Sequence, residues 1–159
     1  MPLPTAARDY LIKALEGTPV VLQSLIGEHS DSAAIWDRRP DPERFTLREI
    51  LGHLADWETI WLERLQRMAT GDHPFLPSVD EGLLAVAHDY AHSSPTHNFT
   101  RIRLGRDHLV TYLKAVPDDF WDLTGDREFV GVLTMQQQAY FILAHDAYHL
   151  RQVAEWVGE

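Results

Sequence analysis

Two histidines four residues apart, His145 and His149 in the segment FILAHDAYHLRQVAEW, are the residues of this chain best suited to bind a metal ion. On a helix, side chains at positions i and i+4 share one face, so two imidazoles can reach the same ion. Apolar neighbours such as Ile142 and Val153 lie within roughly 80° of His145 on a helical wheel, which turns the pair toward the protein interior. Because neutral imidazole is a common transition-metal ligand, the pair predicts a metal site.

A third ligand is available in the segment TLREILGHLADWETIW, where His53 lies on a second helical pattern. Ile50 and Trp57 lie within about 80° of its direction, so His53 also faces inward. The other histidines lack this setting: most lie near Pro, Ser or Gly, His29 lies at an expected helix end, and His108 is isolated on a helix. We therefore predict His53, His145 and His149 as the metal ligands.

Further polar and aromatic residues lie close to these histidines on the same two helical patterns. The residues best placed to assist are Asp56, Trp57, Arg64, Tyr148 and Gln152. Asp56 lies roughly 60° from the direction of His53, so it is the candidate catalytic base or a group that orients an imidazole; a solvated carboxylate is the alternative. Trp57, Tyr148 and Gln152 are the candidate substrate-binding residues, although an inward tryptophan such as Trp57 more often packs in the core, and Gln152 would serve equally as a buried amide bonded to backbone.

Composition limits the class of protein. A chain of 159 residues without cysteine predicts a single domain over residues 1–159 and excludes disulfides, thiolate zinc sites and a cysteine nucleophile. The 14 basic and 24 acidic residues give a net charge of −10, which argues against a nucleic-acid partner. Neither a signal peptide nor an apolar run long enough to span a membrane is evident, so we expect a soluble, cytoplasmic protein without a membrane partner.

Hydrophobic periodicity predicts four long helices, over residues 5–28, 46–68, 96–115 and 134–157. The first is expected to kink or divide at Thr18 and Pro19, while Thr46 and Thr134 are the expected N-caps of the second and fourth. Residues 71–95 form a long crossover with one short helix over 80–90, and the segment DLTGDREFVGVL is expected to be a loop, without any β-hairpin. The fold class is all-α: a four-helix bundle with a long crossover between its second and third helices.

The segments TLREILGHLADWE and LTMQQQAYFILAHDAYHLRQV closely resemble the two signature regions of the DinB-like family, which includes the YfiT-type thiol transferases. The resemblance covers nearly the whole chain, and the PDDFWDL connection is also typical. It implies a four-helix bundle in which one histidine of the second helix and an HxxxH pair of the fourth hold a divalent metal. Those positions are His53, His145 and His149.

Two other metal-site classes fit this sequence poorly. HDAYH places Asp146 where a zinc protease of the HExxH type has its glutamate, but that class needs a further ligand downstream. Glu155 lies roughly 240° from His149 on the same helix, so it faces elsewhere. A ferritin-like di-iron site would need two Glu-x-x-His elements, which the metal-facing helices do not supply.

Three imidazoles leave coordination positions open, which favours a divalent-metal-dependent enzyme of the thiol S-transferase or hydrolase type. Zinc or nickel is expected before iron, with a small-molecule substrate and a low-molecular-weight thiol as a candidate co-substrate. The resemblance also implies a homodimer. The alternatives are a non-catalytic metal-binding or stress-associated bundle protein, and a small-molecule carrier that uses the tryptophan-rich interior.

Overall fold

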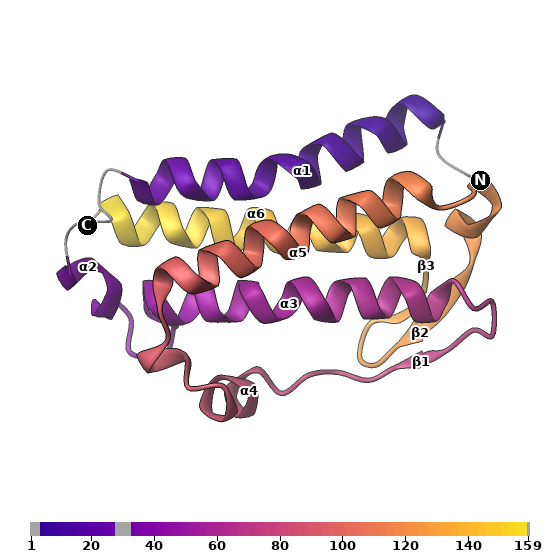
Figure 1. The fold of residues 1–159 in the computed structure, drawn as a ribbon. Coiled ribbons are helices and arrows are strands. Elements are labelled where there is room, and N and C mark those ends of the chain that lie inside the picture. The colour runs from indigo at the N-terminus through magenta and orange to yellow at the C-terminus, as the bar shows by residue number, and fades with distance from the viewer. Residues whose placement is uncertain (1–3, 28–32, 159) are drawn as a thin grey trace.

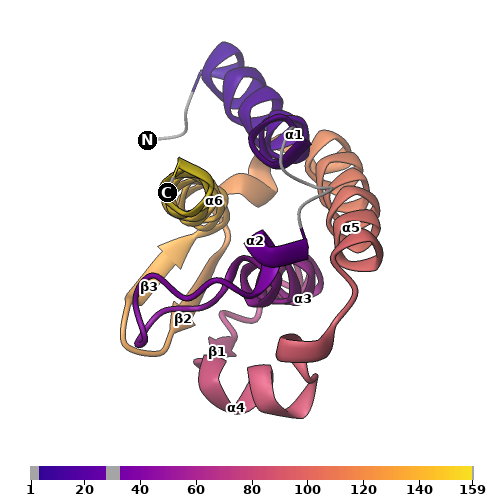
Figure 2. The ribbon, with the colours of Figure 1, turned by 90° about the vertical axis from the view of Figure 1, so that its left-hand side faces the viewer.

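Four long helices form the body of the molecule in the computed structural model, which describes residues 4–27 and 33–158. They are α1 (Thr5–Gly27), α3 (Leu47–Met68), α5 (Pro95–Ala115) and α6 (Met135–Gly158). Seen end-on, they occupy the corners of a bundle in which α1 and α3 lie diagonally opposite (Figure 2). The predicted all-α four-helix bundle is confirmed. Glu28, where the first helix was expected to end, and His29 lie outside the described residues.

The chain direction follows from the connections between these helices. Helices α3 and α5 run parallel to each other, and α1 and α6 run parallel in the opposite direction (Figure 1). A parallel pair of consecutive helices needs a connection that returns along the whole bundle, and residues 69–94 supply it. The predicted long crossover is therefore present. It carries β1 (Phe75–Leu76), α4 (Glu81–Ala87) and the 3-10 helix η1 (Tyr90–His92).

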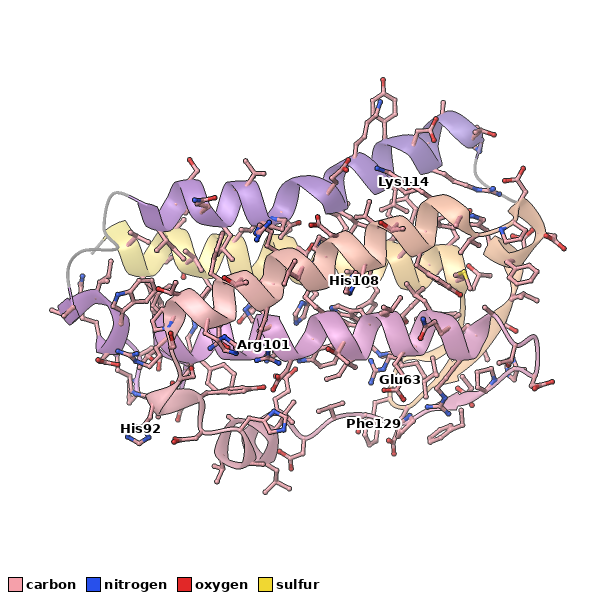
Figure 3. All side chains as sticks on the ribbon, viewed as in Figure 1. Glu63, His92, Arg101, His108, Lys114 and Phe129 are labelled. Atoms are coloured by element: carbon pink, nitrogen blue, oxygen red, sulfur yellow. The ribbon has the colours of Figure 1, made fainter. Side chains whose placement is uncertain are left out.

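The connection before α6 is not the loop that the sequence predicted. After the 3-10 helix η2 (Asp118–Asp122), strands β2 (Thr124–Arg127) and β3 (Gly131–Thr134) form an antiparallel hairpin, and β1 pairs parallel with β2. The expectation of no hairpin was wrong because β2 has the sequence TGDR, which lacks alternating apolar residues. The turn has positive φ angles at Phe129 and Gly131, and Phe129 is 89% exposed there. Figure 3 labels Phe129 on this hairpin.

Polar side chains fix where the site-bearing helices begin. Thr46 caps α3: its hydroxyl accepts from the Glu49 amide while the Glu49 carboxylate accepts from the Thr46 amide. Thr134 and Gln137 make the same reciprocal pair of bonds at the start of α6. Each cap satisfies two amides that have no partner inside the helix. Both expected N-caps are confirmed, and they set the registers that place the histidines.

Helix α1 continues through Pro19 as one element instead of dividing into two. A proline inside a helix removes the hydrogen bond to the carbonyl four residues earlier, which here belongs to Leu15. That carbonyl accepts instead from Nη1 of Arg106 on α5, at 2.9 Å. The hydroxyl of Thr18 donates to Asp146 on α6 at 2.8 Å. Both irregular residues of α1 thus lie beside a polar cluster in the bundle interior.

Two apolar clusters fill the bundle on either side of this polar level. One contains Leu15, Trp61 and Leu109, and the other contains Leu22 and Ile102. Burial of these large side chains supplies the main favourable free energy of folding. None of the described helices is long and apolar enough to cross a lipid bilayer.

Helices α5 and α3 approach closely at Gly105. A Cβ atom at this position would lie 2.5 Å from Cβ of Glu58. Both residues lie in the middle of long packed helices, so the two backbones cannot separate without disturbing the core. We expect Gly105→Ala to lower the free energy of unfolding by about 1–3 kcal/mol, as is usual for overpacking, despite the better helix propensity of alanine.

Gly17→Ala is the matched control, because a Cβ there meets no atom within 4 Å. It should raise stability by up to about 1 kcal/mol through helix propensity alone. Urea unfolding monitored by circular dichroism measures both variants. Equal stability of the two alanine variants would contradict the close packing of α5 on α3.

Candidate metal centre

The three histidines selected by periodicity converge between α3 and α6. Nε2 of His53 lies 3.1 Å from Nε2 of His145 and 3.0 Å from Nε2 of His149. The exposed fraction is 1% for His53 and 7% for His149. Within the described ranges, this trio is the group of His, Cys, Asp or Glu residues whose ligand atoms lie close enough to hold a metal.

The spacing of these nitrogens suits a first-row divalent ion. Two imidazole nitrogens bound at about 2.0–2.1 Å to one ion are themselves about 3 Å apart, which is the separation seen here. Nδ1 of His149 lies 3.0 Å from Oε1 of Gln152, so Nδ1 carries the proton and Nε2 presents its lone pair to the trio. The donor set and its tautomer therefore fit a bound metal.

Burial keeps the trio in the form that binds metals. Desolvation, followed by repulsion from His149, lowers the pKa of His53 to about 3 and that of His145 to about 2. The pKa of His149 is also lowered, again chiefly by burial, although its bond to Gln152 acts in the opposite direction. All three imidazoles are therefore neutral at physiological pH, and a neutral imidazole can ligate a metal without first losing a proton.

Aromatic rings surround the trio on its protein side. Phe45 and Trp57 lie 5.6 Å and 5.9 Å from the ring of His53, and Trp61 lies 5.3 Å from the ring of His145. Trp57 is 4% exposed. By contrast, Tyr148 packs edge-on against His149 at 5.0 Å and is 58% exposed. The exposed ring of Tyr148 places one edge of the trio close to solvent, and the buried tryptophans exclude water from another.

Asp56 lies one turn from His53 and is 6% exposed, and its carboxylate is engaged with other groups. It accepts hydrogen bonds from Arg101 at 2.6 Å, from Tyr90 at 2.6 Å and from Nδ1 of His88 at 2.5 Å. Arg101, labelled in Figure 3, reaches this carboxylate from α5. Burial raises the pKa of Asp56, but these hydrogen bonds outweigh burial and lower it below its usual value. Such a carboxylate is a weak proton acceptor.

The acidic residue inside the HDAYH motif faces a different side of α6. Asp146 is 2% exposed and accepts from Nη1 of Arg106 at 2.5 Å and from Nη2 of Arg106 at 2.9 Å. Arg106 also binds both carboxylate oxygens of Glu58, at 3.0 Å and 2.7 Å. Asp146 therefore occupies a buried ion-pair cluster, unlike the glutamate of an HExxH protease, which must reach the metal-bound water.

Several residues around the site carried no pattern that sequence inspection could detect. Tyr90, His88 and Arg101 reach Asp56 from the crossover and from α5, and Arg106 lies on a helix whose apolar positions gave no reason to expect a buried cation. Arg127 lies on β2, in the segment that was expected to be a loop. Their positions depend on contacts distant in sequence, which helical periodicity does not encode.

Comparison with known proteins identifies the family of this chain. The family model described as the DinB superfamily matches residues 6–153. The chain belongs to the DinB superfamily. No match was found among curated proteins.

Among solved structures, the DinB chain is similar to YfiT from Bacillus subtilis, with a TM-score of 0.87 and 17% sequence identity over 97% of this chain and 87% of that one. YfiT is described as a probable metal-dependent hydrolase with an unusual four-helix bundle topology. At this identity the similarity concerns the fold. The DinB match itself includes all three histidines of the trio.

The lowered histidine pKa values predict how the metal-free protein responds to acid. The unfolded chain binds protons near pH 6.5, whereas His53 and His145 in the folded protein bind them near pH 3 and 2, so the unfolded state gains protons first. The free energy of unfolding should therefore fall as pH drops below about 6.5, by up to about 1.4 kcal/mol per pH unit for each histidine.

Urea unfolding of chelator-treated protein between pH 7 and pH 5 measures this slope, in a range where most carboxylates stay ionised. His145→Phe should reduce the slope, while replacement of His108, an exposed residue on α5 labelled in Figure 3, should leave it unchanged. A slope that is the same in wild type and His145→Phe would contradict the desolvation of the trio.

Proposed function

We propose that this DinB protein is a metal-dependent hydrolase that acts on a small molecule. The observation that carries the proposal is the convergence of three neutral imidazoles from α3 and α6: His53 and His149 are buried, His145 is half-buried, and Nε2 of His53 lies 3.1 Å and 3.0 Å from Nε2 of His145 and His149. Burying three imidazoles side by side is unfavourable unless a shared ligand satisfies their nitrogens. The description of YfiT as a probable metal-dependent hydrolase supports the same class of activity.

His53, His145 and His149 would hold the ion, and we propose zinc or nickel before iron because imidazole sites bind Fe²⁺ less tightly than either in the usual affinity order of divalent metals. A divalent ion with three protein ligands keeps positions open and lowers the pKa of a bound water toward neutrality. Gln152 orients His149 through Nδ1, and Trp57 and Trp61 exclude water from the buried side of the site. Tyr148, exposed at the edge of His149, is the residue we propose to contact substrate first.

For Asp56 we propose a positioning role instead of the proton transfer that the sequence suggested. Its two oxygens accept from His88 and Tyr90 of the crossover and from Arg101 of α5, and its pKa is lowered. The carboxylate thereby ties the crossover and α5 to the turn of α3 that carries His53. A metal held by the three histidines would lower the pKa of a bound water enough for that water to release its proton to solvent, so hydrolysis would not need Asp56 as a base.

Two other functions make different experimental predictions. A thiol S-transferase would use the same open metal face to bind a thiolate, so it would need a low-molecular-weight thiol for turnover. A small-molecule carrier would use the cavity of about 420 Å³ that Trp36, Leu51 and Phe99 line between α1, α2 (Ala33–Asp37), α3 and α5. None of the three histidines lines this cavity, so a carrier would keep its ligand after the metal is removed. The homodimer implied by the resemblance stays a prediction that sedimentation analysis measures.

Loss of one ligand should abolish tight metal binding. We expect His149→Ala to lower zinc affinity at least about 100-fold, because two imidazoles alone hold an ion far less well than three. His108→Ala, which removes an exposed histidine, should bind zinc as wild type does. Isothermal titration calorimetry of chelator-treated protein measures both; unchanged affinity in His149→Ala would refute the site.

Gln152 provides a finer test, since it touches a ligand without being one. Gln152→Ala removes the acceptor of the His149 Nδ1 proton and should weaken zinc binding about 10- to 100-fold, as is typical for groups that orient a ligand. Gln66→Ala, at an exposed position of α3, is the matched control and should change nothing. Equal affinities in the two variants would show that Gln152 does not orient the site.

The activity itself is tested with zinc-loaded protein against a panel of small esters, amides and lactones, each with and without low-molecular-weight thiols. Turnover that needs zinc but no thiol supports the hydrolase, whereas turnover that needs both supports thiol transfer. Activity that survives in metal-free His149→Ala would exclude the metal-dependent enzyme.

A further inference from the structure

Two arginines contact Trp61, the ring that packs against His145. The guanidinium carbon of Arg64 on α3 is 5.6 Å from the ring centre of Trp61, and that of Arg127 on β2 is 5.3 Å from the same ring. Trp61 in turn packs edge-on against His145 at 5.3 Å. Both cations and His145 therefore contact the same aromatic ring.

The hydrogen-bonding groups of these arginines are only partly used. Arg64 is 4% exposed and donates from Nη2 to the Pro77 carbonyl at 2.8 Å, but its buried Nη1 has no partner among the described residues. Nη1 of Arg127 is likewise buried without a partner, and the Arg127 side chain makes no hydrogen bond within residues 4–27 and 33–158. Buried donors without acceptors are costly and rare in native proteins.

The charges of the two arginines are also uncompensated. Neither forms an ion pair within 4.0 Å in the part of the chain that the structure describes. Opposite charges act on them at longer range: the carboxylate of Glu81, at the start of α4, attracts Arg127, and that of Glu63 attracts Arg64. Burial, followed by repulsion from Arg64, lowers the pKa of Arg127 to about 10. Both groups still carry a full positive charge at neutral pH.

Stacking on aromatic rings explains only part of this arrangement. Arg127 lies 4.1 Å from the ring centre of Phe141, and Arg64 lies 5.1 Å from that of Trp57. Such contacts stabilise the charge through the ring faces. The N–H donors, however, lie in the plane of the guanidinium and point past the rings, so stacking does not satisfy them.

We propose that Arg64 and Arg127 form a subsite for an oxyanion of the substrate, a carboxylate or a phosphate group, beside the metal centre. Guanidinium groups match the paired oxygens of these anions, and two of them with free donors can bind both oxygens. The identity of the occupant as substrate rests on the proposed function, because Trp61 contacts both His145 and the two arginines and so places the subsite next to the proposed metal. The substrate class is therefore a small molecule with an anionic group near the bond that is cleaved.

Calorimetric titration with inorganic phosphate and, separately, with succinate tests the subsite in zinc-loaded and in metal-free full-length protein. Because an anion can also ligate zinc directly, the metal-free arm isolates the contribution of the arginines. Arg127→Gln should weaken binding of the preferred anion roughly 10- to 100-fold in both arms, the range expected for loss of hydrogen bonds to a charged group. Arg103→Gln removes one positive charge from an exposed position of α5 and should leave affinity within about twofold.

Arg64→Lys is the second variant, since a buried lysine keeps the charge but not the paired donors, and it too should weaken binding. A stronger response to phosphate than to succinate, or the reverse, identifies which oxyanion the subsite takes. Anion binding that requires zinc and is unchanged in both arginine variants would overturn the proposal, as would no binding of either anion by wild type. If the protein does not bind zinc but still binds anions through the two arginines, the proposed hydrolase is refuted and the anion subsite is supported.

Discussion

The buried guanidinium of Arg106 holds the four helices in one arrangement. From α5 it reaches Glu58 on α3, Asp146 on α6 and the Leu15 carbonyl on α1, and it is only 2% exposed. A charge so far from water is tolerable only when it is paired and all its donors are used, so each helix must present its acceptor at this level of the bundle. Rotating α3, α5 or α6 would leave a buried charge unpaired, and rotating α1 would leave one buried donor of Arg106 without its acceptor.

This constraint also positions the candidate metal centre. Asp146 lies between His145 and His149 in sequence, so fixing Asp146 toward α5 and α1 turns the histidine pair toward α3. Glu58 does the same for α3: it faces α5, which leaves His53 on the side that faces α6. The ion-pair cluster and the histidine trio thus lie on different faces of the same two helices, α3 and α6. The ion pairs fix how these helices are rotated, and this rotation places the three histidines.

Local patterns were sufficient to predict the helices, their caps and the inward histidines, because helical periodicity and capping boxes act within a few residues. The hairpin could not be predicted, since Thr124–Arg127 pairs through its backbone and its side chains do not alternate. The partners of Asp56 come from residues 32 to 45 positions away. The role of Pro19 likewise became clear only when Arg106 was seen at the carbonyl it frees.

Helix α3 arranges the proposed chemistry in a single stripe. His53, Trp57, Trp61 and Arg64 follow one another at intervals of four, four and three residues, so they share one face of the helix. At 1.5 Å of rise per residue, the Cα atoms of His53 and Arg64 are about 16 Å apart. Side chains on a helix lean toward its N-terminus, however, and the guanidinium of Arg64 lies over the ring of Trp57. The distance between metal ligand and cation is therefore set by the helix itself. A substrate that touches both must be small and must lie along Trp57 and Trp61, which come between His53 and Arg64 on this face.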